Sequence, residues 1–397
     1  MNLLQSSTAR LSIAALLPLA LAGCRPHDFP QYPANYREYA YVTNGSSGTV
    51  SVFDVVNVRL DRELAVGQNP VAVAASPTRN EVYVVNSGAA SGQGSVSVID
   101  ATQNAVVATI GVHRAPVSIE IDPTGKLAYV ANSGSNSISV LDLTARREIG
   151  LIGAGEEPVS ARLAPDGKTL VVGNRRGNSV SLIDPASRTV RAIFEGCPGA
   201  SDAVILPDSS KAFVACSAGH QVISIALARA EAHPAQQPAI PARPDRIEAL
   251  LDVGKAPLQL ALKPDGGELF ALNSLSDSIS EVVTGKNDVG GATMIGSNPV
   301  RGLVSNDNSL LYVSNFSSQY VTLYAIEDGR RVYPSIHVGD GPSALAFSSY
   351  GNLLFVVDAR SSDVAVVRTH TPQPSLFTLL PTGRSPNAIA VKAFQLR

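Results

Sequence analysis

The sequence predicts an all-β protein, a single β-propeller whose blades are four-stranded antiparallel sheets. Two observations carry this prediction. A short apolar run recurs about every 42 residues, and its last residues stand at positions 44, 86, 132, 174, 216, 273, 315 and 358. Between these runs, alternating segments and Gly/Pro turns follow in a fixed order. Because one such unit cannot bury both faces of its sheet, the units must pack face to face around an axis.

Each unit contains the apolar run, which we call the anchor and which ends in Asn in its clearest copies. Clear anchors begin at Tyr41, Tyr83, Tyr129 and Tyr312, and decayed ones at Val171, Phe213, Phe270 and Phe355. The segments after the anchors, such as 95–100 and 137–142, alternate Ser with Val or Ile. A period of two with β-branched residues predicts strands.

A further strand, such as 106–112, leads into a Gly-x-x-Pro turn, as at 155–158 and 254–257. Another apolar strand follows, for example at 116–121, and a Pro-Asp-Gly-Lys turn at 165–168 returns the chain to the next anchor. Gly, Pro and Asp favour such tight turns. Each unit therefore holds four short antiparallel strands.

The number of blades follows from the two ends of the repeat array. There are eight anchors and eight copies of the strand that precedes an anchor. The first anchor has no such strand before it, and the last copy, at 386–391, has no anchor after it. The two incomplete units complement each other, so we expect eight blades closed by the C-terminal strand. Seven blades is the alternative, if one decayed repeat is miscounted.

The N-terminus differs in kind from the repeats. Arg10 precedes an apolar run, 11–23, that is too short to span a bilayer permanently and is typical of a signal peptide. The run ends in Leu-Ala-Gly before Cys24, which resembles the bacterial lipobox, whose cysteine is acylated. We therefore expect lipidation of Cys24 and attachment to the cell envelope. Arg25 as the next residue favours the outer membrane, exposed to the periplasm or the cell surface.

Three regions follow from these patterns. Residues 1–23 form the signal peptide, and 24–38, which contain three prolines, form a lipid-anchored tether. Residues 39–397 form the propeller. An Ala/Pro-rich insertion at about 228–246 interrupts the fifth unit and is interpreted as a flexible extension or a partner-docking arm.

The anchors closely resemble those of the YVTN-repeat β-propeller family, and the resemblance covers the chain from about residue 39 to 394. It implies the propeller fold, whereas the repeat residues that carry it serve packing and leave the activity open. Similar propellers include lactone hydrolases and the haem-bearing domain of a periplasmic nitrite reductase. Nothing in this sequence matches their ligands residue by residue.

Composition excludes several functions. The net charge is −2 with no long basic run, so we expect no nucleic-acid partner. The six histidines show no metal-ligand spacing, and no metal is expected. There is no C-x-x-C-H motif for covalent haem, no tryptophan and no G-x-S-x-G motif, so no cofactor and no nucleophile-elbow hydrolase is predicted.

Two cysteines, Cys197 and Cys216, remain after Cys24. An exported chain meets an oxidising compartment, where paired cysteines form disulfides. Aligning the repeats places Cys216 at the last position of an anchor and Cys197 three residues before the strand that pairs with it. We predict a disulfide between them, with free buried thiols as the alternative.

Polar residues depart from the repeat in the strand before the anchor, which lies innermost in a propeller. Asp202, Gln259 and Arg301 stand two residues after the position of the Pro that ends the Gly-x-x-Pro turn. Glu120 and Arg162 stand four residues after that position in their own units. One interpretation is structural, with Glu120 paired to Arg162 and Arg301 paired to Asp202. The other is that the channel presents Asp202, Gln259 and Arg301 to a small polar ligand.

Strand polarity places the Gly-x-x-Pro turns and the loops after the anchors on one rim. Arg175, Arg176 and His220 fall on this rim. Loops on a rigid scaffold often carry binding, although scattered solvated side chains are the alternative. We place any ligand at the channel mouth on this rim, where charges of both signs suit a small polar ligand or an acidic segment of a partner protein.

Taken alone, the sequence favours a monomeric, membrane-anchored, non-catalytic scaffold for binding or protein interaction. The absence of a catalytic motif supports this interpretation. The alternative is a propeller enzyme or cofactor carrier, similar to a lactone hydrolase or to a haem-binding nitrite reductase domain.

Overall fold

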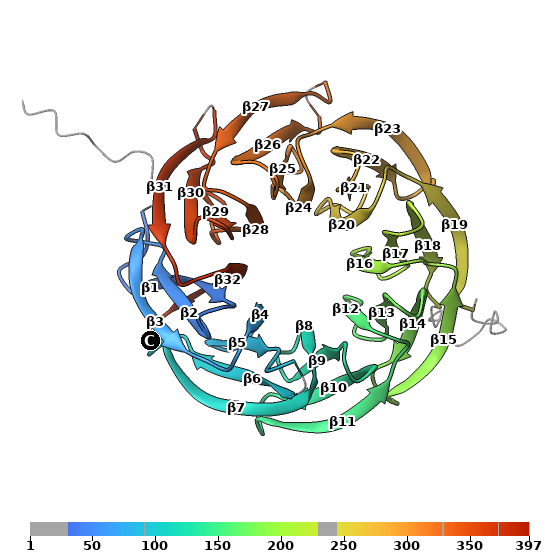
Figure 1. Cartoon of the computed structure of the whole chain (residues 1–397), viewed down its shortest axis with the longest axis horizontal. Helices are drawn as coiled ribbons and strands as arrows, with labels where there is room; N and C mark the ends of the chain where they lie inside the picture. Colours follow the sequence, from blue (N-terminus) through green and yellow to red (C-terminus); the bar gives the residue numbers. More distant parts are fainter. Residues whose placement is uncertain (1–30, 91, 229–243, 328, 372, 397) are drawn as a thin grey trace, which may run out of the picture.

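The computed structural model describes residues 31–396 except 91, 229–243, 328 and 372. These residues form 32 strands and no helix, arranged as eight four-stranded antiparallel sheets around a common axis (Figure 1). The prediction of an all-β propeller with eight blades, rather than seven, is confirmed. No helix within the described residues is long and apolar enough to cross a bilayer.

The first four blades, numbered in chain order, have the following strands. Blade 1 has β1 (Tyr36–Asn44), β2 (Thr49–Asp54), β3 (Arg59–Ala65) and the C-terminal β32 (Pro386–Gln395). Blade 2 has β4 (Pro70–Ala75), β5 (Glu81–Asn86), β6 (Gln93–Asp100) and β7 (Ala105–Arg114). Blade 3 has β8 (Pro116–Ile121), β9 (Leu127–Asn132), β10 (Ser137–Asp142) and β11 (Arg147–Gly153). Blade 4 has β12 (Pro158–Leu163), β13 (Leu170–Asn174), β14 (Ser179–Asp184) and β15 (Thr189–Glu195).

The other four blades repeat this order. Blade 5 has β16 (Ala200–Ile205), β17 (Lys211–Cys216), β18 (Gln221–Ala226) and β19 (Arg246–Asp252). Blade 6 has β20 (Pro257–Leu262), β21 (Glu268–Asn273), β22 (Ser278–Val283) and β23 (Asp288–Met294). Blade 7 has β24 (Pro299–Val304), β25 (Leu310–Asn315), β26 (Tyr320–Ala325) and β27 (Val332–His337). Blade 8 has β28 (Pro342–Phe347), β29 (Leu353–Asp358), β30 (Asp363–Arg368) and β31 (Ser375–Pro381).

The two ends of the chain close the ring within blade 1, as the incomplete repeats predict. The last strand, β32, pairs antiparallel with β1 from Tyr36–Gln395 to Asn44–Pro386. Lys392 on β32 also donates a 2.7 Å hydrogen bond to the Ser76 carbonyl next to blade 2. Strand β1 begins inside the segment that the sequence predicts as tether, because Glu38 is buried and accepts hydrogen bonds from Tyr36 and from the backbone of blade 8.

The hydrophobic core is divided into eight clusters, each between two neighbouring blades. Side chains on alternate faces of each sheet enter the two neighbouring clusters, as period-two strands require. The aromatic residue that begins most anchors is among the largest fully buried side chains. The blades therefore cohere mainly through apolar contacts with their neighbours.

The Asn that ends an anchor organises the rim of its blade. Asn174 donates hydrogen bonds to Ser179 at 3.2 Å and to Ser181 at 2.9 Å, and five other blades repeat this pattern. A Cβ atom on Gly155 of the preceding turn would lie 2.6 Å from the Asn174 amide, so the turn needs Gly at this position. The acceptors are hydroxyl groups of the next strand and, in blade 7, also the Tyr320 carbonyl, so these Asn residues have a structural role.

The turns lie on two opposite rims of the ring. Pro158 pairs with Asn174, so the Gly-x-x-Pro turns and the loops after the anchors share one rim, which we call the anchor rim. The opposite rim carries turns such as 165–168. The insertion expected at 228–246 falls between β18 and β19, and most of it lies outside the described residues. Cys24 and the expected signal peptide also lie outside them.

Candidate functional site

The innermost strand of every blade faces the axis of the ring (Figure 1). The polar departures from the repeat fall on β8, β12, β16, β20 and β24, which belong to the consecutive blades 3 to 7. The corresponding positions of blades 8, 1 and 2 are occupied by alanines, namely Ala344, Ala346, Ala388, Ala390, Ala72 and Ala74. The axis is therefore polar and charged on one side and apolar on the other.

A row of three charged side chains runs from blade 3 to blade 5. Arg162 Nη1 lies 3.6 Å from Glu120 Oε2, and its Nη2 lies 3.2 Å from Asp202 Oδ1. Asp202 and then Glu120 raise the pKa of Arg162. Burial raises the pKa of Glu120, although Arg162 opposes this shift. The structure thus joins Glu120 to Arg162, as the structural interpretation has it, and extends the pair to Asp202.

The polar side chains at the axis also bind the backbone of the next blade. Asp202 Oδ2 accepts a 3.2 Å hydrogen bond from Leu260 N, and Gln259 Oε1 accepts one of 2.7 Å from Gly302 N. The innermost strand has an unpaired edge, whose N–H groups need acceptors. Asp202 and Gln259 thus hold neighbouring blades together, and their polar atoms already have protein partners.

Arg301 differs from the rest of this row. Within the described residues, its guanidinium group has no ion pair and no hydrogen bond, whereas the oxygens of Asp202 are bound by Arg162 and Leu260. Arg301 is exposed, yet burial among protein atoms lowers the pKa of its guanidinium, and Asp202 opposes this shift. A cation that water can reach but protein surrounds is suited to hold an anion.

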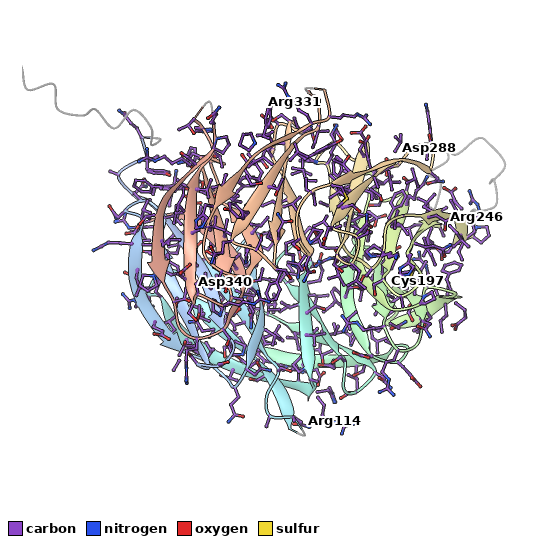
Figure 2. The ribbon with its side chains drawn as sticks, turned by 45° about the horizontal axis from the view of Figure 1, so that its top comes forward. Arg114, Cys197, Arg246, Asp288, Arg331 and Asp340 are labelled. Atoms are coloured by element: carbon purple, nitrogen blue, oxygen red, sulfur yellow. A yellow bond between two sulfur atoms is a disulfide. The ribbon has the colours of Figure 1, made fainter. Side chains whose placement is uncertain are left out.

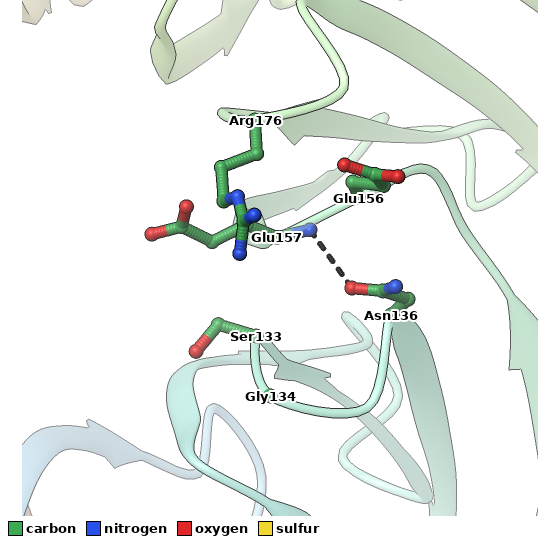
Figure 3. Close-up of a pocket in the computed structure, with 6 residues that line it drawn as sticks. All are labelled: Ser133, Gly134, Asn136, Glu156, Glu157 and Arg176. Carbon is green, nitrogen blue, oxygen red and sulfur yellow. Dashed lines mark hydrogen bonds between the residues drawn. The ribbon is translucent and has the colours of Figure 1, made fainter.

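A polar hollow of about 470 Å³ lies on the anchor rim between blades 3 and 4 (Figure 3). It is lined by Ser133, Gly134, Asn136, Glu156, Glu157 and Arg176. Figure 3 shows Arg176 extending beside Glu157, and Arg175 lies 3.6 Å from the Glu157 carboxylate. Both arginines are exposed, so water competes for their charges. This hollow is a weaker candidate than the axis.

An apolar groove of about 830 Å³ lies on the outer wall, between β27 and β31. Its lining includes Leu310, Tyr333, Pro334, Ile336 and Leu376. Apolar grooves bind apolar ligands, but those that select one ligand also present converging polar groups. The groove has no charged cluster comparable to the axis.

His220 has a structural role on the anchor rim. Its φ of 57° is left-handed, and its Nδ1 accepts a hydrogen bond from Ala256 N at 3.2 Å. Asn136, Asn178 and Asp277 stand at the corresponding left-handed positions and accept the same backbone hydrogen bond. His220 therefore joins blade 5 to blade 6, which the sequence alone did not indicate.

A disulfide joins Cys197 to Cys216, with the two Cα atoms 4.9 Å apart. Figure 2 shows Cys197 within the body of the propeller, whereas Arg114 and Arg331 project at its periphery. Cys197 and Cys216 occupy the positions that Gly155 and Asn174 hold in blade 4. In blade 5, a covalent bond thus replaces the contact between glycine and the anchor Asn.

Two buried acidic positions were missed by the sequence analysis. Glu281 stands where most other blades have Val or Leu, and it forms an ion pair with Arg330 of blade 7. Asp358 ends the anchor of blade 8 in place of Asn, and Asp363 follows five residues later. In both cases, the sequence shows an acidic residue at a repeat position that is neutral in the other blades, and this difference could have identified the two residues. No group of three or more potential metal ligands exists among the described residues.

Comparisons with known proteins point to propellers that act on lactones. The family model described as "Lactonase, 7-bladed beta-propeller" matches residues 40–154, which span the first three blades. The match covers less than a third of this eight-bladed chain. No curated protein matches the sequence.

Solved structures resemble nearly the whole ring. A putative 6-phosphogluconolactonase from Bacteroides uniformis has a TM-score of 0.60 at 15% identity, over 90% of this chain and 100% of its own. The periplasmic gluconolactonase of Pseudomonas aeruginosa has a TM-score of 0.56 at 15% identity, over 89% and 99%. Hydrazine synthase of Kuenenia stuttgartiensis has a TM-score of 0.57 at 22% identity, over 83% and 92%. At these identities the likeness shows the β-propeller fold.

Proposed function

We propose that this β-propeller hydrolyses a lactone at the axis of the ring, rather than acting as the non-catalytic scaffold that the sequence alone favours. The observation that carries the proposal is Arg301, a guanidinium group at the axis without a protein partner among the described residues. The partial match to a lactonase family and the likeness to gluconolactonase structures support the same reaction class.

Hydrolysis of a lactone places negative charge where a guanidinium group can hold it. Water adds to the carbonyl carbon, the ring C–O bond breaks, and the ring oxygen takes a proton to give a hydroxy acid. Donors placed at the carbonyl oxygen stabilise the charge that develops there. Arg301 would bind this oxygen and then the carboxylate of the product, which matches the fork of a guanidinium group.

Blade 8, next to Arg301, carries Ala344 and Ala346 at the corresponding positions, so the uncharged part of the lactone would face small apolar side chains. Glu120, Arg162 and Asp202 are engaged with one another and with backbone N–H groups. They would fix the wall of the site and keep the blades in register around the ligand. No general base is assigned to them.

The test is to incubate the protein with δ-gluconolactone or 6-phosphogluconolactone. The rate of acid release is measured and compared with the rate of spontaneous hydrolysis. Arg301→Ala should lower kcat/KM by about 100- to 1,000-fold, as expected for loss of one donor to the developing oxyanion. Arg301→Lys should restore little, because an ammonium group lacks the planar fork. Arg147→Ala, at an exposed position on β11, is the control. A native chain that does not exceed the spontaneous rate with any lactone would contradict the proposal.

A non-catalytic binding protein is the second candidate function. The observation that favours it is that the carboxylates of the charged row all have protein partners, so none is placed as a base. In that case gluconate should bind without turnover, measured by calorimetry, and Arg301→Ala should weaken the binding with little change in melting temperature. A partner protein with an acidic segment would be recognised by the same guanidinium group.

We also propose that the protein is a monomer anchored to the cell envelope, with the outer membrane favoured, through a lipid on Cys24. The support is the lipobox at the end of a short apolar run. Mass spectrometry of the mature N-terminus and membrane fractionation test this proposal. Cys24→Ala should yield an unprocessed or soluble chain, and a variant that keeps an acylated N-terminus would contradict it.

A further inference from the structure

Blade 8 departs from the hydrogen-bonding pattern of the other anchors. In six blades the anchor ends in Asn, whose amide donates to residues five and seven places later, or nine and eleven places later in blade 2. In blade 8 the three positions are Asp358, Asp363 and Ala365. A carboxyl group thus replaces the amide donor, and a second carboxyl group stands where most blades have a hydroxyl group.

The two carboxyl groups meet in a buried place. Asp358 is fully buried, and its Oδ2 accepts a 3.0 Å hydrogen bond from Gly339 N. The Oδ1 atoms of Asp358 and Asp363 are both buried without a hydrogen-bond donor. A Cβ atom on Gly339 would lie 2.5 Å from Asp363 Oδ1 and 2.7 Å from Asp358 Cβ, so both side chains converge on this glycine. Two carboxyl groups that converge on one glycine with buried oxygen atoms cannot both be ionised at low cost.

Within the part of the chain that the structure describes, no cationic side chain pairs with either acid. Arg360 and Asp340 are the charged groups on the adjoining turns, and they pair with each other at 3.7 Å. Arg360 also donates to the Phe316 carbonyl and lies over the Phe316 ring, so its charge is held towards blade 7. Among the ion pairs of the described residues, none includes Asp358 or Asp363.

We propose that Asp358 and Asp363 bind one proton between them and form a pH-sensitive joint in blade 8. The O–H group of one acid donates to an oxygen of the other, which supplies the donor that the amide of Asn provides elsewhere. Val357 and Val364, next to the two acids, belong to the cluster that packs blade 8 on blade 1. Loss of the proton would therefore weaken the packing of blade 8 on blade 1, where the ring closes.

The direction of the pH effect follows from the raised pKa of the pair. Burial first, and then the hydrogen bond and charge of Asp363, raise the pKa of Asp358 to about 8. An unfolded chain releases this proton near pH 4. The stabilisation is therefore complete below about pH 4 and is lost as pH rises towards 8, where the folded state also ionises.

The experiment compares urea unfolding of the full chain from pH 5 to pH 10 with that of the double variant Asp358→Asn/Asp363→Ser, which restores the common pattern. The unfolding equilibrium constant of the native chain should rise, relative to the variant, by up to tenfold per pH unit and level off above about pH 8. Asp358→Asn alone is the more conservative second variant. Asp340→Asn is the control and should follow the native curve. Parallel curves for the native chain and both Asp358 variants would overturn the proposal.

Infrared spectra separate a proton from a cation at this site. At pH 6, the native chain should show the C=O band of a buried protonated carboxyl group, and Asp358→Asn should lack it. Absence of the band, or a stabilisation of the native chain by millimolar Ca²⁺ that the double variant does not show, would mean that the pair does not share a proton.

Discussion

Polar residues at blade junctions show how one residue can hold two blades together. His220 accepts a backbone hydrogen bond across the junction of blades 5 and 6, where Asn or Asp does so elsewhere. We predict that His220→Asn keeps the stability of the native chain, whereas His220→Ala loses about 1 kcal/mol. Urea unfolding measures both. Equal losses for the two variants would show that the hydrogen bond contributes nothing.

At the residue scale, the sequence predicted ion-pair partners correctly only where the repeat has one departure in each of two neighbouring blades. Glu120 and Arg162 meet this condition, and the structure pairs them. Arg301 and Asp202 are separated by blade 6, and Asp202 is bound by Arg162 instead. A repeat alignment gives the position of a residue along its strand. It does not show which neighbouring side chain forms an ion pair with it.

Blade 5 shows how an element adapts when its repeat decays. Cysteines replace both the turn glycine and the anchor Asn, and Ile223 stands where blade 4 has the hydroxyl acceptor Ser181. The three changes are consistent, because a disulfide needs neither the glycine nor the hydroxyl group. The covalent link takes over the function of the polar contact.

Removing the disulfide should test how much it contributes to this blade. The two cysteines are 19 residues apart, and closing a loop of similar length stabilises a protein by about 3 kcal/mol. We predict a loss of this size for Cys197→Ala/Cys216→Ala in urea unfolding. The reduced native chain should behave like the double variant. Identical stability of the oxidised and reduced native chains would contradict the prediction.

At the element scale, the strands were predictable because alternation and turn residues repeat with every blade. The expected tether was too long at its C-terminal end, since β1 begins at Tyr36. Residues 36–38 lack the period of the repeat and are ordered by contacts that no pattern encodes. Glu38, for example, is bound by Ser349 from the far end of the sequence.

Closure of the whole ring depends on the C-terminal strand. Deleting residues after Ser385 would expose the inner edge of β1 and lose the packing of Ile389 and Val391. Because both side chains are partly buried, their contribution is below the roughly 3 to 6 kcal/mol of two fully buried ones. We predict a clearly lower melting temperature by calorimetry or circular dichroism. Removing residue 397 alone is the control. A truncated chain that melts at the parental temperature would refute closure by β32.

At the scale of the molecule, the sequence predicted the fold almost completely and the function poorly. The same strand and turn pattern occurs in eight repeats, so the fold can be predicted even where the pattern of a single repeat is degenerate. The candidate site occurs once, and it depends on departures from the repeat whose partners lie in other blades. Arg301 became distinct from Asp202 and Gln259 only when their hydrogen bonds to the next blade were seen.

The pairing of β1 with β32 also sets an order for events during synthesis. Asn35 and Leu396 exchange backbone and side-chain hydrogen bonds although 361 residues separate them. While the ribosome makes the middle blades, β1 has an unpaired edge and a complete ring cannot form. Contacts of such long range form late and slowly. The ring of the nascent chain therefore stays open until its last dozen residues emerge.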